Sequence, residues 1–252
     1  RFFGTEVFGL YTLGLVVLRI TELVARLGLD SGAMRFISMS RKDNAGKVKG
    51  ILISASFISF INGILIGGVI YLFAGFVSES IFHKPALTDI IKTFALCVPF
   101  IATMTVTATA SQGFHTTKYA VYIKDIIQPS ANIALVILFV QLGYGISWVV
   151  NAFAISHVIA LLAGFYFIAN QFPEIREKTI KPMYETKRLL SYSAPLLLTG
   201  MLYLVIAWTD TFMLGYMKTS TDVGIYRAAS QVPMFLTLLL GASNSIYAPA
   251  VA

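Results

Sequence analysis

Three charged side chains lie close together in the first apolar segment of the chain. In "LVVLRITELVARLGL", Arg19, Glu22 and Arg26 occupy positions i, i+3 and i+7. At about 100° per residue of an α-helix, these positions fall within about 60° of one another, on one helix face. Arginine can grip an oxyanion through two donors, so this face is a candidate site for an anionic ligand.

The depth of Arg19 in its apolar run makes it the strongest candidate. The run extends from about Val7 to Leu29, which places Arg19 near its middle. A lipid-facing arginine at the bilayer centre costs about 3 kcal/mol on the insertion scale, so we expect Arg19 to face protein or water. Two structural alternatives stay open. Arg19 could only pair with Glu22, and Arg26, about 5 Å from the helix end, could snorkel to the interface.

Other polar residues inside apolar runs are weaker candidates. Lys124 and Asp125 could contact an anionic ligand, form a local ion pair or pair with the helix that carries Arg19. Asp210 has no basic neighbour within a helical turn, so it is a candidate for protonation or for binding a coupling cation. A helix-packing hydrogen bond to a threonine or serine is the alternative for Asp210. We interpret Asn62 and His157 as interior polar groups that are satisfied by hydrogen bonds.

Motifs for enzyme chemistry are missing from the sequence. It has no Gly-Lys-Ser/Thr phosphate loop and no His-Glu-x-x-His motif, and its three histidines are far apart. The single cysteine, Cys97, cannot form an internal disulfide. We therefore expect no enzymatic activity, no cofactor and no metal site.

Composition indicates the environment that surrounds these residues. Hydrophobic residues make up 57% of the 252 residues and charged residues 12%, about half the charged share of an ordinary soluble domain. We expect an all-α integral membrane protein, a polytopic bundle of about seven transmembrane helices. Each apolar run has at least about 23 residues, enough to cross a core roughly 30 Å thick. The runs are Val7–Leu29, Gly50–Val77, Ile90–Gln112, Tyr119–Leu142, Ile146–Ala169, Leu189–Met217 and Val223–Val251.

Two local patterns bear on how these helices pack. The stretch "IATMTVTATAS" at 101–111 alternates like a β-strand, but it lies within one long apolar run. We interpret it as a helix whose small residues allow close packing. "GILIG" at 63–67 matches the GxxxG packing motif, which is a weak signal because glycine is common in membrane helices.

The basic residues orient the bundle. The connection at 35–50 carries five bases and one acid, and that at 170–188 carries five bases and three acids. By the positive-inside rule we expect both to be cytoplasmic, and "HKPALTD" at 83–89 to face outward. The net charge of +7 is then explained by topology, so no nucleic-acid partner is expected.

A repeated motif predicts a duplicated architecture. "EVFGLYTLG" at 6–14 returns as "TDVGIYRAA" at 221–229. Superposing the two copies implies parallel repeats of about six helices, with one more helix before Arg1 and at least four after Ala252. We expect residues 1–170 to be an N-terminal lobe, 171–188 a cytoplasmic linker, and 189–252 the start of a C-terminal lobe.

The sequence resembles a known family along its whole length. The similarity is carried by "FFGTEVFGLYTLG", "RLGLDSGAMRFIS" and the series Ala194-Pro195, Asp210, Leu214-Gly215 and Gly224-x-Tyr226. These segments resemble bacterial O-antigen and oligosaccharide-lipid flippases of the multidrug/oligosaccharidyl-lipid/polysaccharide superfamily. The resemblance implies a two-lobed transporter of about 12 to 14 helices around a central cavity.

The resemblance also implies a function. A polyprenyl-diphosphate-linked oligosaccharide would pass by alternating access from the cytoplasmic to the outer leaflet of a bacterial or archaeal plasma membrane. A polysaccharide polymerase and glycosyltransferases become candidate partners. A drug or cation antiporter of the same superfamily is the alternative, although it would need an acidic cavity rather than Arg19. A membrane glycosyltransferase or ligase would need an acidic catalytic group in a sizeable outer loop, and the outer loops are short.

Overall fold

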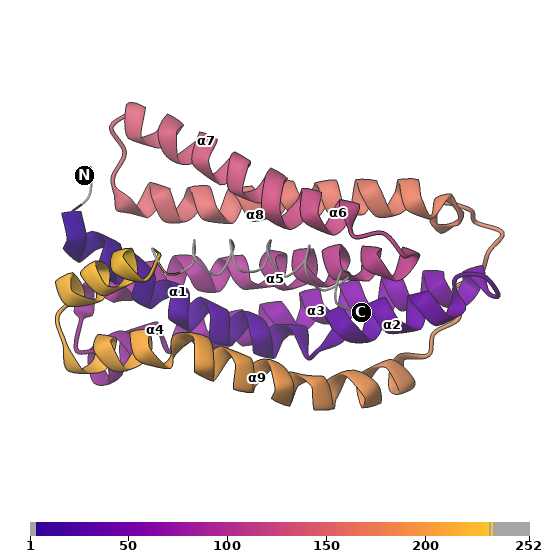
Figure 1. Ribbon diagram of the computed structural model, residues 1–252, viewed down its shortest axis with the longest axis horizontal. Coiled ribbons are helices and arrows are strands. Elements are labelled where there is room, and N and C mark those ends of the chain that lie inside the picture. The colour runs from indigo at the N-terminus through magenta and orange to yellow at the C-terminus, as the bar shows by residue number, and fades with distance from the viewer. Residues whose placement is uncertain (1–3, 232, 234–252) are drawn as a thin grey trace, which may run out of the picture.

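The computed structural model describes residues 4–231 and 233 of the chain. Within them, long helices run side by side along one axis of an elongated bundle, and there is no β-strand (Figure 1). The long helices are α1 (Gly4–Arg26), α2 (Leu29–Ser40), α3 (Ala45–Leu72), α5 (Thr88–Ser111), α7 (Gln128–Gln141), α8 (Ile146–Gln171) and α9 (Thr186–Met217). The short elements are α4 (Ala74–Phe76), η1 (Val77–Ile81), η2 (Pro85–Leu87), η3 (Gln112–Phe114), α6 (Lys118–Val121), η4 (Tyr122–Ile127) and η5 (Pro173–Ile175).

Six helical segments of the described chain are long and apolar enough to cross a membrane. They coincide with the first six predicted runs, which confirms the prediction of an all-α polytopic membrane protein. The strand-like stretch 101–111 lies inside α5, as predicted. The seventh run, Val223–Val251, lies mostly outside the described residues, although 220–231 are helical.

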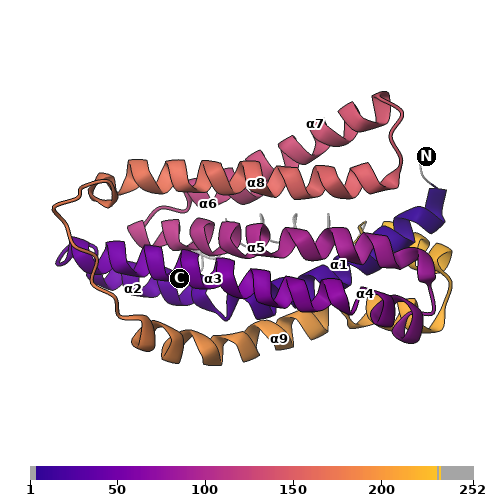
Figure 2. The ribbon, with the colours of Figure 1, turned by 180° about the vertical axis from the view of Figure 1, so that it is seen from behind.

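Helix α5 is the centre of the bundle. It packs against α3 on one side and α8 on the other, and also against α1 (Figure 2). Glycines allow the close approach of α3. A Cβ atom on Gly63 would lie 2.5 Å from Pro99 Cα, and one on Gly67 would lie 2.6 Å from the Ala95 carbonyl oxygen. The GxxxG motif is therefore used for packing within this chain.

The connection expected at residues 35–50 is mostly helical, which corrects the sequence prediction. α2 continues to Ser40 and α3 already begins at Ala45, so only 41–44 lie between them. Asn44 caps α3 by accepting a hydrogen bond of 3.0 Å from the backbone N–H of Lys47. The end of an apolar run marks the edge of the hydrocarbon core and not the end of the helix. Lysine and arginine are good helix formers, so a helix can continue beyond that edge.

The fourth span is not a regular α-helix. The turn at η4 is a π-helix, and it is followed at once by Pro129 in α7. Proline has no backbone N–H and clashes with the carbonyl of residue i−4, here Asp125, which disfavours regular α-helical bonding. π turns occur often at functional sites. Here the π turn carries Lys124 and Asp125.

The two basic connections meet at one end of the bundle. The backbone N–H of Met183 donates to the Gly46 carbonyl at 2.8 Å, and the Lys47 ammonium lies 2.8 Å from the Glu185 carboxylate. At the opposite end, Lys84 donates to the carbonyl of Gly215 in the last turn of α9 at 2.6 Å. This arrangement agrees with the prediction that residues 35–50 and 170–188 share one side of the membrane.

Candidate functional site

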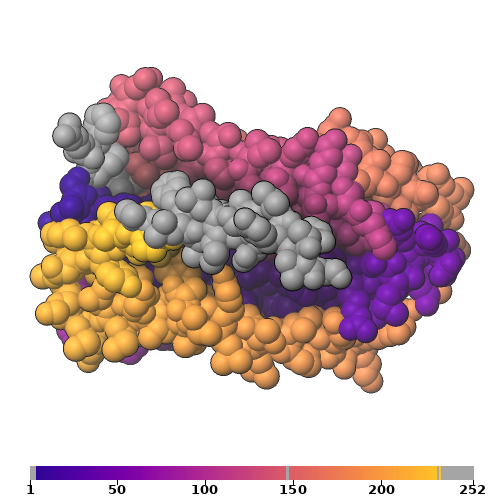
Figure 3. Space-filling model, viewed as in Figure 1, coloured from indigo at the N-terminus to yellow at the C-terminus, as the bar shows by residue number. Residues whose placement is uncertain are grey.

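A cavity of about 500 Å3 lies inside the bundle. It is bounded by α1, α5, η4, α7, α8 and α9. In the space-filling view, the surface is recessed between α6 (magenta) and α9 (orange), with the indigo surface of the N-terminal helices behind (Figure 3). The lining residues are Arg19, Glu22, Leu23, Arg26, Met104, Thr105, Lys124, Gln128, His157, Gly200, Tyr203, Leu204 and Trp208.

Glu22 is the buried carboxylate of this cavity, with only 3% of its surface exposed. One of its oxygens lies 3.0 Å from Arg19 Nη1. The other accepts a hydrogen bond of 2.9 Å from the Thr105 hydroxyl and lies 3.7 Å from Arg26 Nε. The helical spacing i, i+3, i+7 therefore brings all three charged groups into contact, and α5 supplies the fourth partner.

The two arginines differ in how much of their donor capacity is used. Arg26 also donates from Nη1 to Asp30 at 2.7 Å, which ties it to α2. The Arg19 side chain is 43% exposed, and Glu22 is the one carboxylate that it contacts among the described residues. Arg19 thus pairs with Glu22 and lines the cavity at the same time. A structural ion pair and a place on the cavity wall are therefore compatible for this residue.

Lys124 enters the cavity from the π turn. Its ammonium donates to the Thr109 hydroxyl at 2.7 Å, and none of the ion pairs within the described chain includes it. Asp125, predicted with it, is exposed and does not line the cavity. Consecutive side chains point about 100° apart in an α-helix and slightly less in a π turn, so Lys124 and Asp125 point in different directions.

Neutral polar groups complete the wall. Gln128 donates to the Ser156 hydroxyl at 3.1 Å, and His157 Nδ1 lies 2.7 Å from the Phe153 carbonyl oxygen. Their cavity role was not anticipated, although Gln128 stands one helical turn after Lys124 and so shares its face. Tyr203 and Trp208 of α9 were also missed, since aromatic residues are common throughout the apolar runs.

Asp210 lies outside this cavity. It accepts hydrogen bonds from the Tyr226 hydroxyl and from the backbone N–H of Thr211, the latter at 2.6 Å. Asp210 thus makes a helix-packing hydrogen bond, as its alternative expected, but the partner on the next helix is a tyrosine and not a threonine or serine. Asn62 likewise behaves as a satisfied interior group, because it donates to the Val24 and Ala25 carbonyls at 3.1 and 2.9 Å.

The charge of the cavity indicates the sign of its ligand. Three basic side chains, Arg19, Arg26 and Lys124, line it together with one carboxylate, Glu22, and a second carboxylate, Asp30, pairs with Arg26, which leaves an excess of one positive charge. Arg26 Nε is buried without a hydrogen-bond partner in the described part of the chain. In the low dielectric of a helix bundle, an excess of buried positive charge is stabilised by a bound anion.

The fold and the cavity define a class of protein, a multi-pass membrane protein built entirely of helices with a basic cavity in its interior. The chain belongs to the polysaccharide biosynthesis protein family, whose model matches residues 1–251. No curated protein and no solved structure gives a significant match.

Proposed function

We propose that this chain takes part in flipping a polyprenyl-diphosphate-linked oligosaccharide from the cytoplasmic to the outer leaflet of a bacterial or archaeal plasma membrane. The observation that carries the proposal is the basic cavity inside a membrane-spanning bundle of a polysaccharide biosynthesis protein. Alternating access would expose this cavity to one side of the membrane and then to the other.

The cavity meets the main physical demand of that task. A diphosphate head loses its hydration when it enters the membrane, and that cost must be offset by charge and hydrogen bonds. Arg19 offers an exposed guanidinium near the middle of α1, while Glu22 holds it in place. Arginine binds phosphate oxygens through two donors and stays charged when it is desolvated.

The same wall offers groups suited to sugar. Gln128 and His157 present polar atoms for hydroxyl groups, and Tyr203 and Trp208 present aromatic rings whose apolar faces can pack on a sugar ring. The alternative of a drug or cation antiporter is disfavoured by the charge of the cavity, because a cation would meet three basic side chains.

Arg19 provides the test of this proposal. In cells expressing the full protein, we expect Arg19→Ala to abolish sugar-lipid export and Arg19→Lys to retain part of it. Loss of one charged hydrogen-bonding group weakens binding by about 1.5 to 3 kcal/mol, or roughly 10- to 100-fold. Export is measured as surface polysaccharide per unit of protein in the membrane.

Two comparisons separate a substrate role from a structural one. Lys42→Ala, at an exposed basic residue outside the cavity, should export normally. The double variant Arg19→Ala, Glu22→Ala should stay inactive, because it restores charge balance but still lacks the guanidinium group that would bind the phosphate. Recovery of export in the double variant, or normal export by Arg19→Ala at normal abundance, would remove Arg19 from the substrate path.

A further inference from the structure

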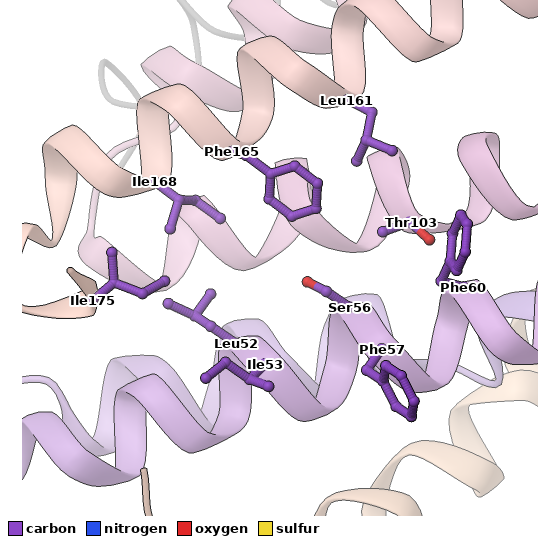
Figure 4. A pocket seen from close by; sticks show the side chains of 10 residues that line it. All are labelled: Leu52, Ile53, Ser56, Phe57, Phe60, Thr103, Leu161, Phe165, Ile168 and Ile175. Atoms are coloured by element: carbon purple, nitrogen blue, oxygen red, sulfur yellow. The ribbon is translucent and has the colours of Figure 1, made fainter. Parts of the chain in front are cut away.

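An apolar groove of about 410 Å3 lies between α3 and α8 (Figure 4). It is separate from the basic cavity and shares none of its lining residues. Side chains of α3 and α8 face one another across α5. The lining residues are Leu52, Ile53, Ser56, Phe57, Phe60, Thr103, Leu161, Phe165, Ile168 and Ile175.

The groove and the basic cavity lie on opposite faces of α5. Thr103 lines the groove and Thr105 lines the cavity, and two residues of a helix correspond to about 200° of rotation. The hydroxyl of Thr103 is satisfied, since it donates to the Pro99 carbonyl at 2.7 Å. The groove therefore offers almost purely apolar surface and suits a hydrocarbon chain.

Its depth corresponds to a single leaflet. From Leu52 to Phe60 the groove follows α3 for roughly 12 Å, against a half-thickness of about 15 Å for the hydrocarbon core. It begins beside Ile175 of η5, at the end of the bundle where the basic connections meet, and it ends near the middle of α3. The rim is open, with Phe57 64% and Phe165 45% exposed.

The charge at the mouth of the groove is basic overall. Arg176 and Lys178 follow Ile175 and are exposed. Two acids, Glu174 and Glu177, lie in the same segment, but a third base, Lys49 of α3, is held there by a hydrogen bond of 2.6 Å from its ammonium to the Glu177 carbonyl oxygen. Basic residues at the membrane surface attract anionic headgroups.

We propose that this groove binds one acyl chain of an anionic phospholipid, whose phosphate group is held by Arg176 and Lys178. The bound chain fills the space between α3 and α8 and so supports the face of α5 that lies behind the basic cavity. The proposal does not depend on the transported substrate, because it rests on the groove and on the charges at its mouth.

Tryptophan fluorescence in vesicles tests the proposal. In a Trp148→Phe, Trp208→Phe background, Phe165→Trp places a reporter on the groove. We expect brominated phosphatidylglycerol to quench it with a higher association constant than brominated phosphatidylcholine, by about five-fold for each basic side chain engaged. The matched control is Tyr166→Trp, which is 60% exposed on the same helix outside the groove and should show no preference.

Two variants examine the two halves of the site. Arg176→Gln, Lys178→Gln should abolish the preference for the anionic lipid, and Ser56→Phe should reduce quenching of the groove reporter by both lipids because it fills the groove. Equal quenching of the Phe165→Trp reporter by the two lipids would overturn the proposal. Quenching that Ser56→Phe leaves unchanged, in a protein with a normal elution volume in size-exclusion chromatography, would also overturn it. Displacement of the phospholipid by low concentrations of polyprenyl phosphate would also overturn it, since the groove would then hold a substrate tail.

Discussion

At the scale of single residues, Glu22 is the carboxylate shared by both arginines of the basic cavity. A buried carboxylate that contacts Arg19, Arg26 and Thr105 offsets part of the repulsion between the two guanidinium groups. The excess of positive charge remains available to a ligand. A pairing role and a binding role are thus compatible for the arginines of this cavity.

This arrangement predicts a large stability effect at Glu22. Glu22→Gln should destabilise the protein by about 1.5 to 3 kcal/mol, because both arginines lose a charged hydrogen-bonding partner, although Arg26 keeps Asp30. The thermal midpoint in detergent measures the change. Glu177→Gln, at an exposed acid, should leave that midpoint nearly unchanged. A similar midpoint for both variants would show that Glu22 does not hold the arginines.

At the scale of elements, helix spacing depends on where glycine faces a neighbour. In α3, Gly67 faces α5, whereas a methyl group added to Gly68 would have no neighbouring atom within 4 Å. The two residues are adjacent in the chain and share the same helical environment. They therefore form a natural pair for measuring the close contact between α3 and α5.

We predict opposite outcomes for the two alanine substitutions. Gly68→Ala should be neutral or stabilise the helix by up to about 1 kcal/mol, because alanine has the higher helix propensity. Gly67→Ala should destabilise the protein by about 1 to 3 kcal/mol, since it overpacks the interface with Ala95. Thermal midpoints of the two variants decide this, and equal midpoints would contradict the packing described for α3 and α5.

The linker before α9 is held to α3 by a charge pair that depends on pH. Glu185 lies outside the spanning segments, and the hydrogen bond from Lys47 lowers the pKa of its carboxyl group below the ordinary 4.5. A lowered folded-state pKa adds stability above pH 4.5, and this is lost as the pH falls through the folded value. The Lys47 and Glu185 side chains are 32% and 26% exposed, so solvent screens the pair and its contribution is small and local.

Hydrogen exchange should reveal this local effect. Amide protection factors at 174–184 should fall in the wild type as the pH drops from 4.5 through the lowered pKa of Glu185. In Glu185→Gln they should already be lower at pH 7 and change less on acidification. Amides of α5 serve as the internal reference. A linker whose protection does not respond to Glu185→Gln would show that Met183 and Gly46 hold it without the charge pair.

At the scale of the whole molecule, the two copies of the repeated motif contact each other. A Cβ atom on Gly9 would meet the Ser220 carbonyl oxygen and the backbone nitrogen of Gly224, and one on Gly224 would meet Thr5 and Gly9. Equivalent residues meet in this way near a two-fold axis. The division into two related lobes, 1–170 and 189–252 joined by 171–188, stays a prediction.

The topology of the molecule can be tested with single cysteines. In a Cys97→Ser background, Lys42→Cys and Ala86→Cys place exposed thiols at opposite ends of the bundle. We predict that a membrane-impermeant thiol reagent labels residue 86 but not residue 42 on intact cells, because basic connections stay in the cytoplasm. Both sites should react after the membrane is permeabilised. Labelling of residue 42 alone on intact cells would show that the orientation is the opposite of the predicted one.

The sequence by itself determined the properties that depend on local physics. Hydrocarbon thickness sets the length of a span, so six spans could be located from apolar runs alone. The rotation per residue of a helix placed Arg19, Glu22 and Arg26 on one face before any neighbour was known. The cost of an arginine in lipid likewise indicated that Arg19 faces the interior.

Only the tertiary structure decided which of the other candidates join that face. Lys124 enters the cavity while its neighbour Asp125 does not, because the fourth span packs with its Lys124 face towards Thr109 of α5. Asp210 is engaged by Tyr226 of the next helix, and His157 reaches the cavity from α8. These outcomes depend on which helices become neighbours. Helix packing results from contacts summed over distant segments, and no single segment of sequence contains that information.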